Sequence, residues 1–344
     1  VTMGAGYFFA DSKDYKNALK YFNKSAQLDN KYAPAYNMIG YTQLASNNYP
    51  EAEKAFKAYI KLRPNKADPH NSYAELLLKI GKYDESIAQY KKALQMDTAY
   101  AYAFAGIGNN YIFKNDYEAA RKYYNNYFDK ASDAGGKLYA LTLKAISYVH
   151  EGKIEEAMRV LDDRFALAEK ENRIPDAIYS VADQRFLLTE TGNPSEGMKY
   201  CEKAIDLIGS SKLTDGEKES LGQYAMGWHI YNLIALGELD KSEAELAKYI
   251  QKYESLKQPI DIGEINFYKG YSELKRGNYD KAVTYYSQTD TIETPFNWYC
   301  TAVAYTKLGD KKNASEYYTK IAQSHNNSMD LALFRKRALA ELKK

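Results

Sequence analysis

Apolar and small side chains recur at fixed positions between Pro34 and Pro64, and this pattern predicts two short helices joined by a tight turn. Asn47-Asn48 marks the turn, because Asn tolerates the left-handed backbone geometry in which a helix stops. Small residues are needed where two antiparallel helices cross, since a larger side chain there would cost about 1–3 kcal/mol. The segment therefore predicts one helical hairpin. The pattern is carried by Tyr36, Ile39, Gly40, Ala52, Phe56, Tyr59 and Pro64.

The same pattern repeats along the chain, and one hairpin alone would leave an apolar face bare. The small residue near the start of each second helix falls at Ala18, Ala52, Ser86, Ala120, Ala157, Gly197, Ser242, Ala282 and Ala314. A turn signal precedes each of these, at Lys13-Asp14, Asn47-Asn48, Gly81-Lys82, Asn115-Asp116, Gly152-Lys153, Gly192-Asn193, Gly237-Glu238, Gly277-Asn278 and Gly309-Asp310. We therefore predict nine stacked hairpins. The first four hold a strict spacing of 34 residues, and the later ones drift.

This spacing resembles the tetratricopeptide repeat, a 34-residue unit with the pattern W-x2-L-G-x2-Y followed by Ala, Phe and Pro. The resemblance is strong over residues 6–127 and returns over residues 270–286 and 302–318. It is loose over residues 138–249, where Leu161 stands in place of an aromatic residue. Strict spacing over consecutive units is a far more specific signal than any short motif.

The resemblance implies an all-α fold, a right-handed superhelical solenoid of about nine hairpins plus a C-terminal capping helix. It also implies that the first helices line a concave face, and that the protein binds a peptide or a partner protein without catalysis of its own. We expect regular units in residues 1–132, divergent and longer units in residues 133–327, and the capping helix in residues 328–344.

Four stretches lose the helical pattern and are predicted connectors. They are Lys130–Lys137, Gly209–Glu217, Lys257–Gly263 and Thr289–Pro295. The last helix has a basic face, which could suggest an anionic partner, but we interpret the helix as the solubilising cap that an open-ended solenoid needs. Its predicted apolar stripe is Leu331, Leu333, Phe334, Leu339 and Leu342.

Composition narrows the class of function. The 344 residues are 45% hydrophobic and 27% charged with a net charge of +2, which is too balanced to favour nucleic acid or an anionic membrane surface. No run of 18 apolar residues exists, so no membrane span is expected. Tyrosine is unusually abundant, with 35 residues. Cys201 and Cys300 form no C-x-x-C pair and are expected to be buried, reduced thiols.

The sequence offers no catalytic or cofactor motif. The four histidines lie in different units, and no H-E-x-x-H is present. Gly106-Ile107-Gly108 lacks the third glycine of a dinucleotide fingerprint, and Gly108 is explained by the helix crossing. Gly135-Gly136-Lys137 imitates a P-loop but is followed by Leu138 instead of Ser or Thr. We therefore expect no enzyme activity, no cofactor and no metal.

The positions that would face the groove carry aromatic and amide side chains. Asn can pair with both the N–H and the C=O of an extended peptide, and Tyr offers stiff contact area. We hypothesise a groove for an extended polypeptide or an amphipathic helix, although many of these tyrosines could instead pack between neighbouring units. The candidate residues are Asn37, Tyr41, Asn71, Glu75, Tyr102, Asn109, Tyr231, Phe267, Tyr271 and Tyr299.

One further detail bears on the partner. The chaperone-binding subgroup of the family holds a C-terminal carboxylate with Lys, Arg and Asn, and the matching positions here supply no cations in either register. In one register they hold Met3, Tyr7, Met38, Asp68 and Ser72. A carboxylate clamp is therefore disfavoured.

Other functions stay open at this point. The terminal hairpins could stack on another copy and form a homo-oligomer. Because the repeat pattern is already running at Gly6, the chain could be cut from a longer precursor that lost a leader or an upstream repeat. It could equally be the sensory or regulatory segment of a larger signalling protein. The expected protein is soluble, and either cytoplasmic or, after loss of a leader, periplasmic.

Overall fold

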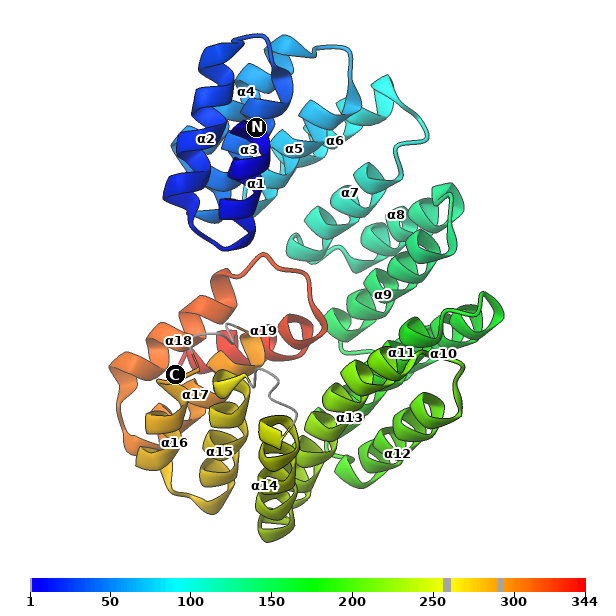
Figure 1. Ribbon diagram of the computed structural model, residues 1–344, viewed down its shortest axis with the longest axis vertical. Coiled ribbons are helices and arrows are strands. Elements are labelled where there is room, and N and C mark those ends of the chain that lie inside the picture. The colour runs from blue at the N-terminus through cyan, green and yellow to red at the C-terminus, as the bar shows by residue number, and fades with distance from the viewer. Residues whose placement is uncertain (1, 256–260, 290–293) are drawn as a thin grey trace. The chain divides into compact units, whose positions relative to one another are not determined.

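The computed structural model describes residues 2–255, 261–289 and 294–344, and across these residues the secondary structure consists of helices and short connectors, with no strand. The predicted connectors at Lys257–Gly263 and Thr289–Pro295 lie largely outside the described residues. Nineteen helices follow one another along the described chain (Figure 1). The all-α prediction is confirmed.

The chain divides into two compact units, unit 1 up to Ala140 and unit 2 from Leu141 onward. Unit 1 contains α1 (Thr2–Asp11), α2 (Tyr15–Leu28), α3 (Ala33–Ala45), α4 (Tyr49–Leu62), α5 (Ala67–Lys79), α6 (Tyr83–Met96), α7 (Ala101–Phe113) and α8 (Tyr117–Lys130). The boundary falls inside α9 (Ala134–Glu151). The extents 1–132 and 133–327 for regular and divergent repeats stay predictions.

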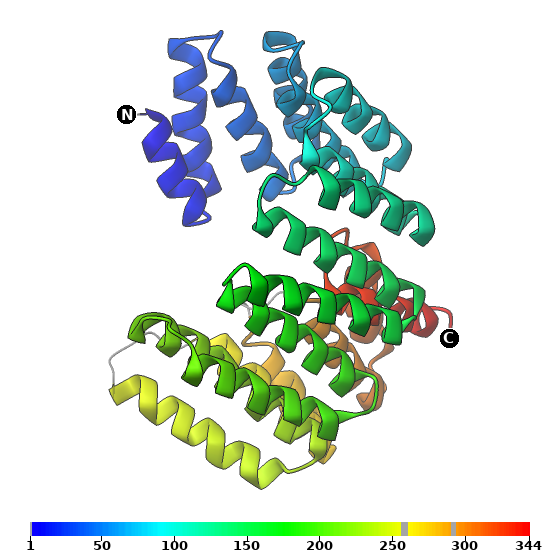
Figure 2. The same cartoon turned by 90° about the vertical axis from the view of Figure 1, so that its right-hand side faces the viewer.

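Unit 2 contains the rest of α9 and ten further helices. These are α10 (Ile154–Lys170), α11 (Ile174–Glu190), α12 (Pro194–Ser210), α13 (Asp215–Leu236), α14 (Leu239–Ser255), α15 (Ile262–Arg276), α16 (Tyr279–Tyr286), α17 (Pro295–Leu308), α18 (Lys311–Gln323) and α19 (Met329–Glu341). Within each unit, successive helices lie side by side in both Figure 1 and Figure 2. Helices α1 to α18 form nine hairpins, as predicted, and α19 follows them.

The hairpin turns form where the sequence predicts them. The first residue of each turn signal has a positive φ, the left-handed region that Gly and Asn tolerate best. These residues are Lys13, Asn47, Gly81, Asn115, Gly152, Gly192, Gly237, Gly277 and Gly309. Asn172, between α10 and α11, has the same geometry and was not predicted.

Close packing of an aromatic ring on a glycine holds three of the four regular hairpins together, and the remaining one has Ala74 in place of the glycine. A Cβ added to Gly40 would lie 2.5 Å from Phe56, and one added to Gly108 would lie 2.3 Å from Tyr124. The predicted small residues are buried throughout the series. Where the small residue is Ser86, its hydroxyl donates to the carbonyl oxygen of Ala74 at 2.7 Å, so the polar atom is satisfied inside the core.

Two predicted connectors are wrong in extent. Residues 131–133 alone separate α8 from α9, because the Asp133 carboxylate accepts a hydrogen bond from the N–H of Gly136 at 2.8 Å in the first turn of α9. Residues 211–214 alone separate α12 from α13, because Thr214 and Glu217 form a capping box at the start of α13.

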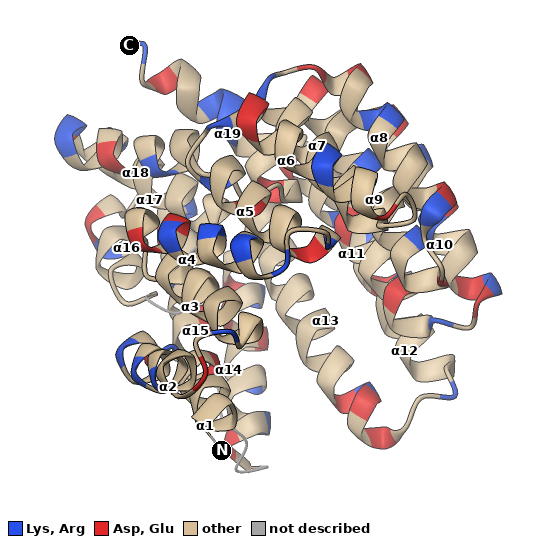
Figure 3. Cartoon of the chain, turned by 90° about the horizontal axis from the view of Figure 1, so that it is seen from above, with Lys and Arg blue, Asp and Glu red and all other residues tan. Residues whose placement is uncertain are grey.

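The stripe predicted for the last helix is wrong in part. Leu331, Leu333 and Phe334 are buried, but Leu339 and Leu342 are 41% and 37% exposed. The helical period gave the correct spacing but could not show where the packing partners end. Acidic and basic residues are interspersed along the helices in Figure 3 and gather on no single element, in keeping with the small net charge.

Candidate functional site

The first helices of unit 1 bring three predicted polar positions together across α3 and α5, along with Ser72, which was not a predicted site residue. The Tyr41 hydroxyl contacts the Ser72 hydroxyl at 3.1 Å and donates to one carboxylate oxygen of Glu75 at 3.0 Å. The Asn71 amide donates to the other oxygen of Glu75 at 2.7 Å. The spacing of 34 residues between Tyr41 and Glu75 places them on adjacent repeats, which is why they meet.

Glu75 is half-buried, and its charge has no counter-ion. Burial raises the pKa of this carboxyl, and the hydrogen bonds from Tyr41 and Asn71 only partly oppose that effect. Among the described residues, no Lys, Arg or His forms an ion pair with Glu75. The site therefore holds a carboxylate supported by neutral donors only.

Tyrosines surround this carboxylate. Burial first, and then the charge of Glu75, raise the pKa of Tyr90 and of Tyr139, and Glu75 also contributes to the raised pKa of Tyr100. A phenol resists ionisation near a negative charge, so the charge of Glu75 disfavours the phenolate form of all three tyrosines. Tyr90 and Tyr100 were not predicted as site residues, and only the excess of tyrosine in the sequence pointed toward them.

An exposed row of aromatic rings continues from this cluster. Tyr102 is 64% exposed and Tyr139 is 49% exposed. Both rings contact Tyr127, with centroid distances of 6.2 Å and 6.1 Å. We refer to Tyr41, Asn71, Glu75, Tyr102 and Tyr139 together as the tyrosine face of unit 1.

The predicted asparagines have different surroundings. Asn71 donates to Glu75, while Asn109 accepts a hydrogen bond from the buried Tyr124 hydroxyl at 2.8 Å. The side-chain oxygen of Asn37 is buried and has no hydrogen-bond partner. At least two of the three amides are therefore already engaged with the protein itself.

The predicted aromatic positions of unit 2 are packed against one another. Tyr231, Phe267 and Tyr271 are buried, and the Tyr231 and Tyr271 rings stack at 5.4 Å. Phe296 joins them, at 5.6 Å from Tyr231 and 5.5 Å from Phe267. Tyr299 is half-buried.

The C-terminal helix α19 completes this aromatic cluster. Phe334 of α19 is fully buried and stacks on Tyr299 at 4.7 Å and on Phe296 at 5.1 Å. It also contacts Phe186 of α11 at 6.4 Å. Figure 1 shows α19 beside α17. The helix therefore covers first-helix residues of its own unit and does more than close the end of the stack.

Polar contacts fix α19 and the segment before it. The Arg337 guanidinium donates to the carbonyl oxygen of Glu190 at 2.9 Å. The Nε2 atom of His150 lies 3.1 Å from the side-chain oxygen of Asn327. Burial lowers the pKa of His150 to about 4, and the charges of Arg335 and Lys336 act in the same direction. None of these contacts between distant segments was predicted.

A second buried polar group of unit 2 centres on Arg185. Its guanidinium donates to the side-chain oxygen of Asn232 at 2.8 Å and lies 4.8 Å from the centre of the Tyr231 ring. The Tyr231 hydroxyl donates to the Glu190 carboxylate. These groups pair with one another inside the unit, although the buried Nε of Arg185 has no hydrogen-bond partner.

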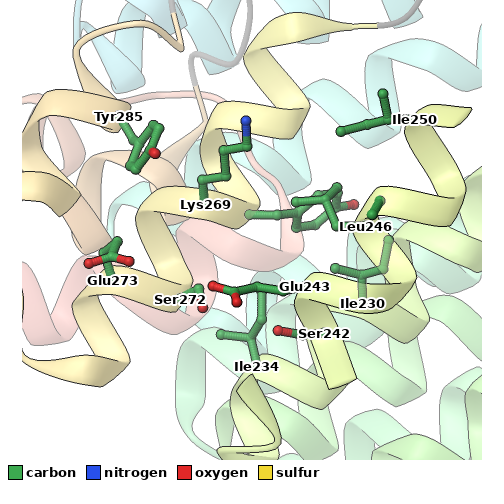
Figure 4. A pocket seen from close by; sticks show the side chains of 12 residues that line it. Ile230, Ile234, Ser242, Glu243, Leu246, Ile250, Lys269, Ser272, Glu273 and Tyr285 are labelled. Atoms are coloured by element: carbon green, nitrogen blue, oxygen red, sulfur yellow. The ribbon is translucent and has the colours of Figure 1, made fainter. Parts of the chain in front are cut away.

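A hollow lies among α13, α14, α15 and α16 (Figure 4). Ile230 and Leu246 line its apolar part. The Ser242 hydroxyl donates to a backbone carbonyl, and the Ser272 hydroxyl accepts from Arg276, so neither is hydrogen-bonded to a base. The described lining offers no nucleophile activated for catalysis. In the described part of the chain, no group of acidic, His or Cys side chains could hold a metal ion.

Cys201 and Cys300 are both free and buried, as expected. Burial raises the pKa of the Cys201 thiol to about 11 and raises that of Cys300 as well, which leaves both as unreactive thiols at neutral pH. Among the described helices, none has the length and apolar character needed to cross a membrane.

The stacked hairpins define the class of protein, a helical-hairpin solenoid. Models of the tetratricopeptide repeat match residues 37–102 and, separately, residues 3–32, 101–129 and 299–324. The chain therefore contains tetratricopeptide repeats over these residues. Proteins of this family typically bind other proteins, and the repeat scaffold is generally not enzymatic.

Curated relatives are longer proteins. The chain is 24% identical over 304 residues to TPR repeat-containing protein MJ1428 of Methanocaldococcus jannaschii, covering 86% of this chain and 43% of that protein. It is 23% identical over 117 residues to anaphase-promoting complex subunit 3 of Schizosaccharomyces pombe, covering 34% of this chain and 18% of that protein. The chain thus spans less than half the length of these relatives.

Solved structures with similar helices include MamA and a tetratricopeptide repeat protein. MamA is 18% identical with a TM-score of 0.40, over 50% of this chain and 92% of that chain. A tetratricopeptide repeat protein from Parabacteroides merdae is 12% identical with a TM-score of 0.45, over 88% of this chain and 97% of that chain.

Proposed function

We propose that this protein is a non-catalytic scaffold that binds a segment of a partner protein on the tyrosine face of unit 1. The observation that carries the proposal is the exposure of Tyr102 and Tyr139 beside the polar cluster of Glu75. Exposed aromatic rings next to satisfied polar groups are typical of protein-binding surfaces, because they provide apolar contact area at low entropic cost.

The two units support this choice of surface in different ways. Unit 2 covers Tyr231, Phe267 and Tyr271 with its own side chains, so these residues offer little area to a partner. In unit 1, Tyr102 and Tyr139 have no such covering among the described residues of that unit. A preformed surface also loses little conformational entropy when it binds.

Binding of degenerate peptide pools tests the proposal. Fluorescein-labelled 11-residue pools are titrated with the wild-type chain and with the double variant Tyr102→Ala/Tyr139→Ala, and polarisation is measured. The matched control is Tyr224→Ala, a tyrosine of unit 2 that is 50% exposed. We expect the double variant to bind at least tenfold more weakly than the control. Equal binding by all three proteins would place the interaction elsewhere.

Self-association is a second candidate function, and one observation favours it. Helix α1 exposes Tyr7 at 42% and Phe8 at 69%, and large exposed apolar side chains often mark contact surfaces. Sedimentation velocity over a hundredfold range of concentration tests this candidate with the wild type and Phe8→Ser. A concentration-dependent shift that Phe8→Ser abolishes would support it, whereas a constant monomer would exclude it.

A further inference from the structure

The Glu75 carboxylate has the features of one half of an ion pair. Each of its oxygens accepts one hydrogen bond, from Asn71 at 2.7 Å and from Tyr41 at 3.0 Å. A carboxylate oxygen has two acceptor positions, so each oxygen can accept a further donor. Both present donors are neutral, and a half-buried negative charge with neutral donors alone is costly.

The surroundings of Glu75 favour a positive charge as the missing partner. The Tyr41 ring is hydrogen-bonded to it, the charge of Glu75 acts on Tyr100 and Tyr139, and the faces of such rings attract cations. Asp68 adds a second negative charge, since it acts on Tyr100 and hydrogen-bonds to it.

We propose that Glu75 anchors a lysine or arginine side chain of the polypeptide that binds the tyrosine face of unit 1. This proposal rests on the proposed function and gives the partner its chemistry. The ammonium or guanidinium group would donate to the remaining acceptor positions of Glu75, and its aliphatic part would lie along the tyrosine rings. An acidic partner is disfavoured, because it would meet two carboxylates.

Four peptide pools test this inference with the full chain. Each pool has 11 residues with a fixed central Lys, Arg, Leu or Glu, and the other positions are degenerate but free of charged residues and cysteine. Polarisation is measured with the wild type and Glu75→Gln. The matched control is Glu264→Gln, because Glu264 of unit 2 is also half-buried and accepts a hydrogen bond from Tyr268 at 2.6 Å.

We expect the wild type to bind the Lys and Arg pools at least tenfold more tightly than the Leu pool, and the Glu pool most weakly. Glu75→Gln should lose this preference yet keep its binding of the Leu pool, and Glu264→Gln should behave as the wild type. If the wild type binds all pools equally, the inference is wrong while the proposed function stands.

If no pool binds the wild type, the proposed function itself fails. Comparing the pools on the wild type alone decides the question even if a variant does not fold, which far-UV circular dichroism would reveal. A preference for Arg over Lys would indicate bidentate pairing with the carboxylate. Equal binding of Lys and Arg would indicate recognition of charge alone, and either result supports the inference.

Discussion

The two units build the same hairpins and use their first helices in opposite ways. In both, an aromatic ring of the second helix lies against a glycine of the first, as Phe56 does on Gly40 and Tyr286 on Gly270. In unit 1 the first helices present Tyr102 to solvent, whereas in unit 2 they bury Tyr231. The repeat pattern therefore specifies the hairpin, and the rest of the chain decides whether a first-helix residue is exposed or becomes core.

The difference has an identifiable cause in α19. This helix brings Phe334 onto aromatic residues of α11 and α17, so residues that would face a ligand in an open solenoid contact the chain itself. In unit 1 the first helices carry the hydrogen-bonded carboxylate of Glu75 instead of a buried aromatic residue, and a charged group is a poor core residue. The face of unit 2 is therefore part of the core, whereas the face of unit 1 is the one that we propose for recognition.

The largest expected effect is the loss of Phe334. Replacing a fully buried phenylalanine by alanine removes its ring contacts and leaves a cavity, which costs about 3–5 kcal/mol. Trp228 and Trp298 are the only tryptophans and both lie in unit 2, so tryptophan fluorescence reports on that unit during urea unfolding. We expect Phe334→Ala to lower the midpoint of this transition strongly.

The control for this prediction lies on the same helix. Leu339 is 41% exposed, and Leu339→Ala should change the free energy of unfolding by less than about 1 kcal/mol. If Phe334→Ala and Leu339→Ala have the same small effect, α19 does not stabilise unit 2. The explanation that α19 causes the difference between the two units would then be wrong. Peptide binding on unit 1 should survive in both variants.

An effect of intermediate size is expected from His150, which lies beside the segment before α19. Burial favours its neutral form and lowers its pKa from 6.5 to about 4. Its contribution to stability is therefore complete above pH 6.5 and is lost as the pH falls from 6.5 toward 4. The loss should reach about 2 kcal/mol at pH 5, and it should appear in the tryptophan-detected transition.

The variant His150→Gln isolates this contribution. Glutamine can still hydrogen-bond to Asn327 but does not titrate, so its stability should decline less than that of the wild type between pH 7 and pH 5. Carboxyl groups titrate in both proteins, and the difference between the two pH profiles removes their effect. Parallel pH profiles would show that protonation of His150 does not cause the loss of stability of unit 2 at acidic pH.

Local sequence signals predict local structure well in this protein. Gly and Asn at turn positions identified eight of the nine hairpin turns, because a positive φ strongly restricts the residue type, and the first turn has Lys13 there. The same signals misjudged the start of α9, where Asp133 caps a helix whose first turn contains two glycines. A cap can outweigh the poor helix propensity of glycine at a helix terminus, where few backbone hydrogen bonds depend on it.

Contacts between distant segments were not predictable from the pattern. Nothing in the spacing of Phe334 indicates that it meets Phe186, since amphipathic helices with the same period can pack on many surfaces. The candidate site was predictable in part. The 34-residue repeat placed Tyr41 and Glu75 on one face, but the surrounding Tyr90 and Tyr100 became visible only with the packing of neighbouring hairpins.

The smallest expected effect sharpens the comparison from the side of unit 1, through the stability of Glu75→Gln. Burial raises the pKa of Glu75, so its ionised form is disfavoured in the folded protein. The contribution of Glu75 to the free energy of unfolding is therefore complete below pH 4.5 and is reduced as the pH rises through the raised pKa.

The variant Glu75→Gln removes the charge. It should leave the free energy of unfolding at pH 7 unchanged or raise it by less than about 1 kcal/mol, because glutamine keeps an acceptor for Tyr41. At pH 4 the two proteins should unfold alike in far-UV circular dichroism. A marked loss of stability at pH 7 would make Glu75 a structural residue, whereas an unchanged or higher midpoint is what a carboxylate kept for binding a cation requires.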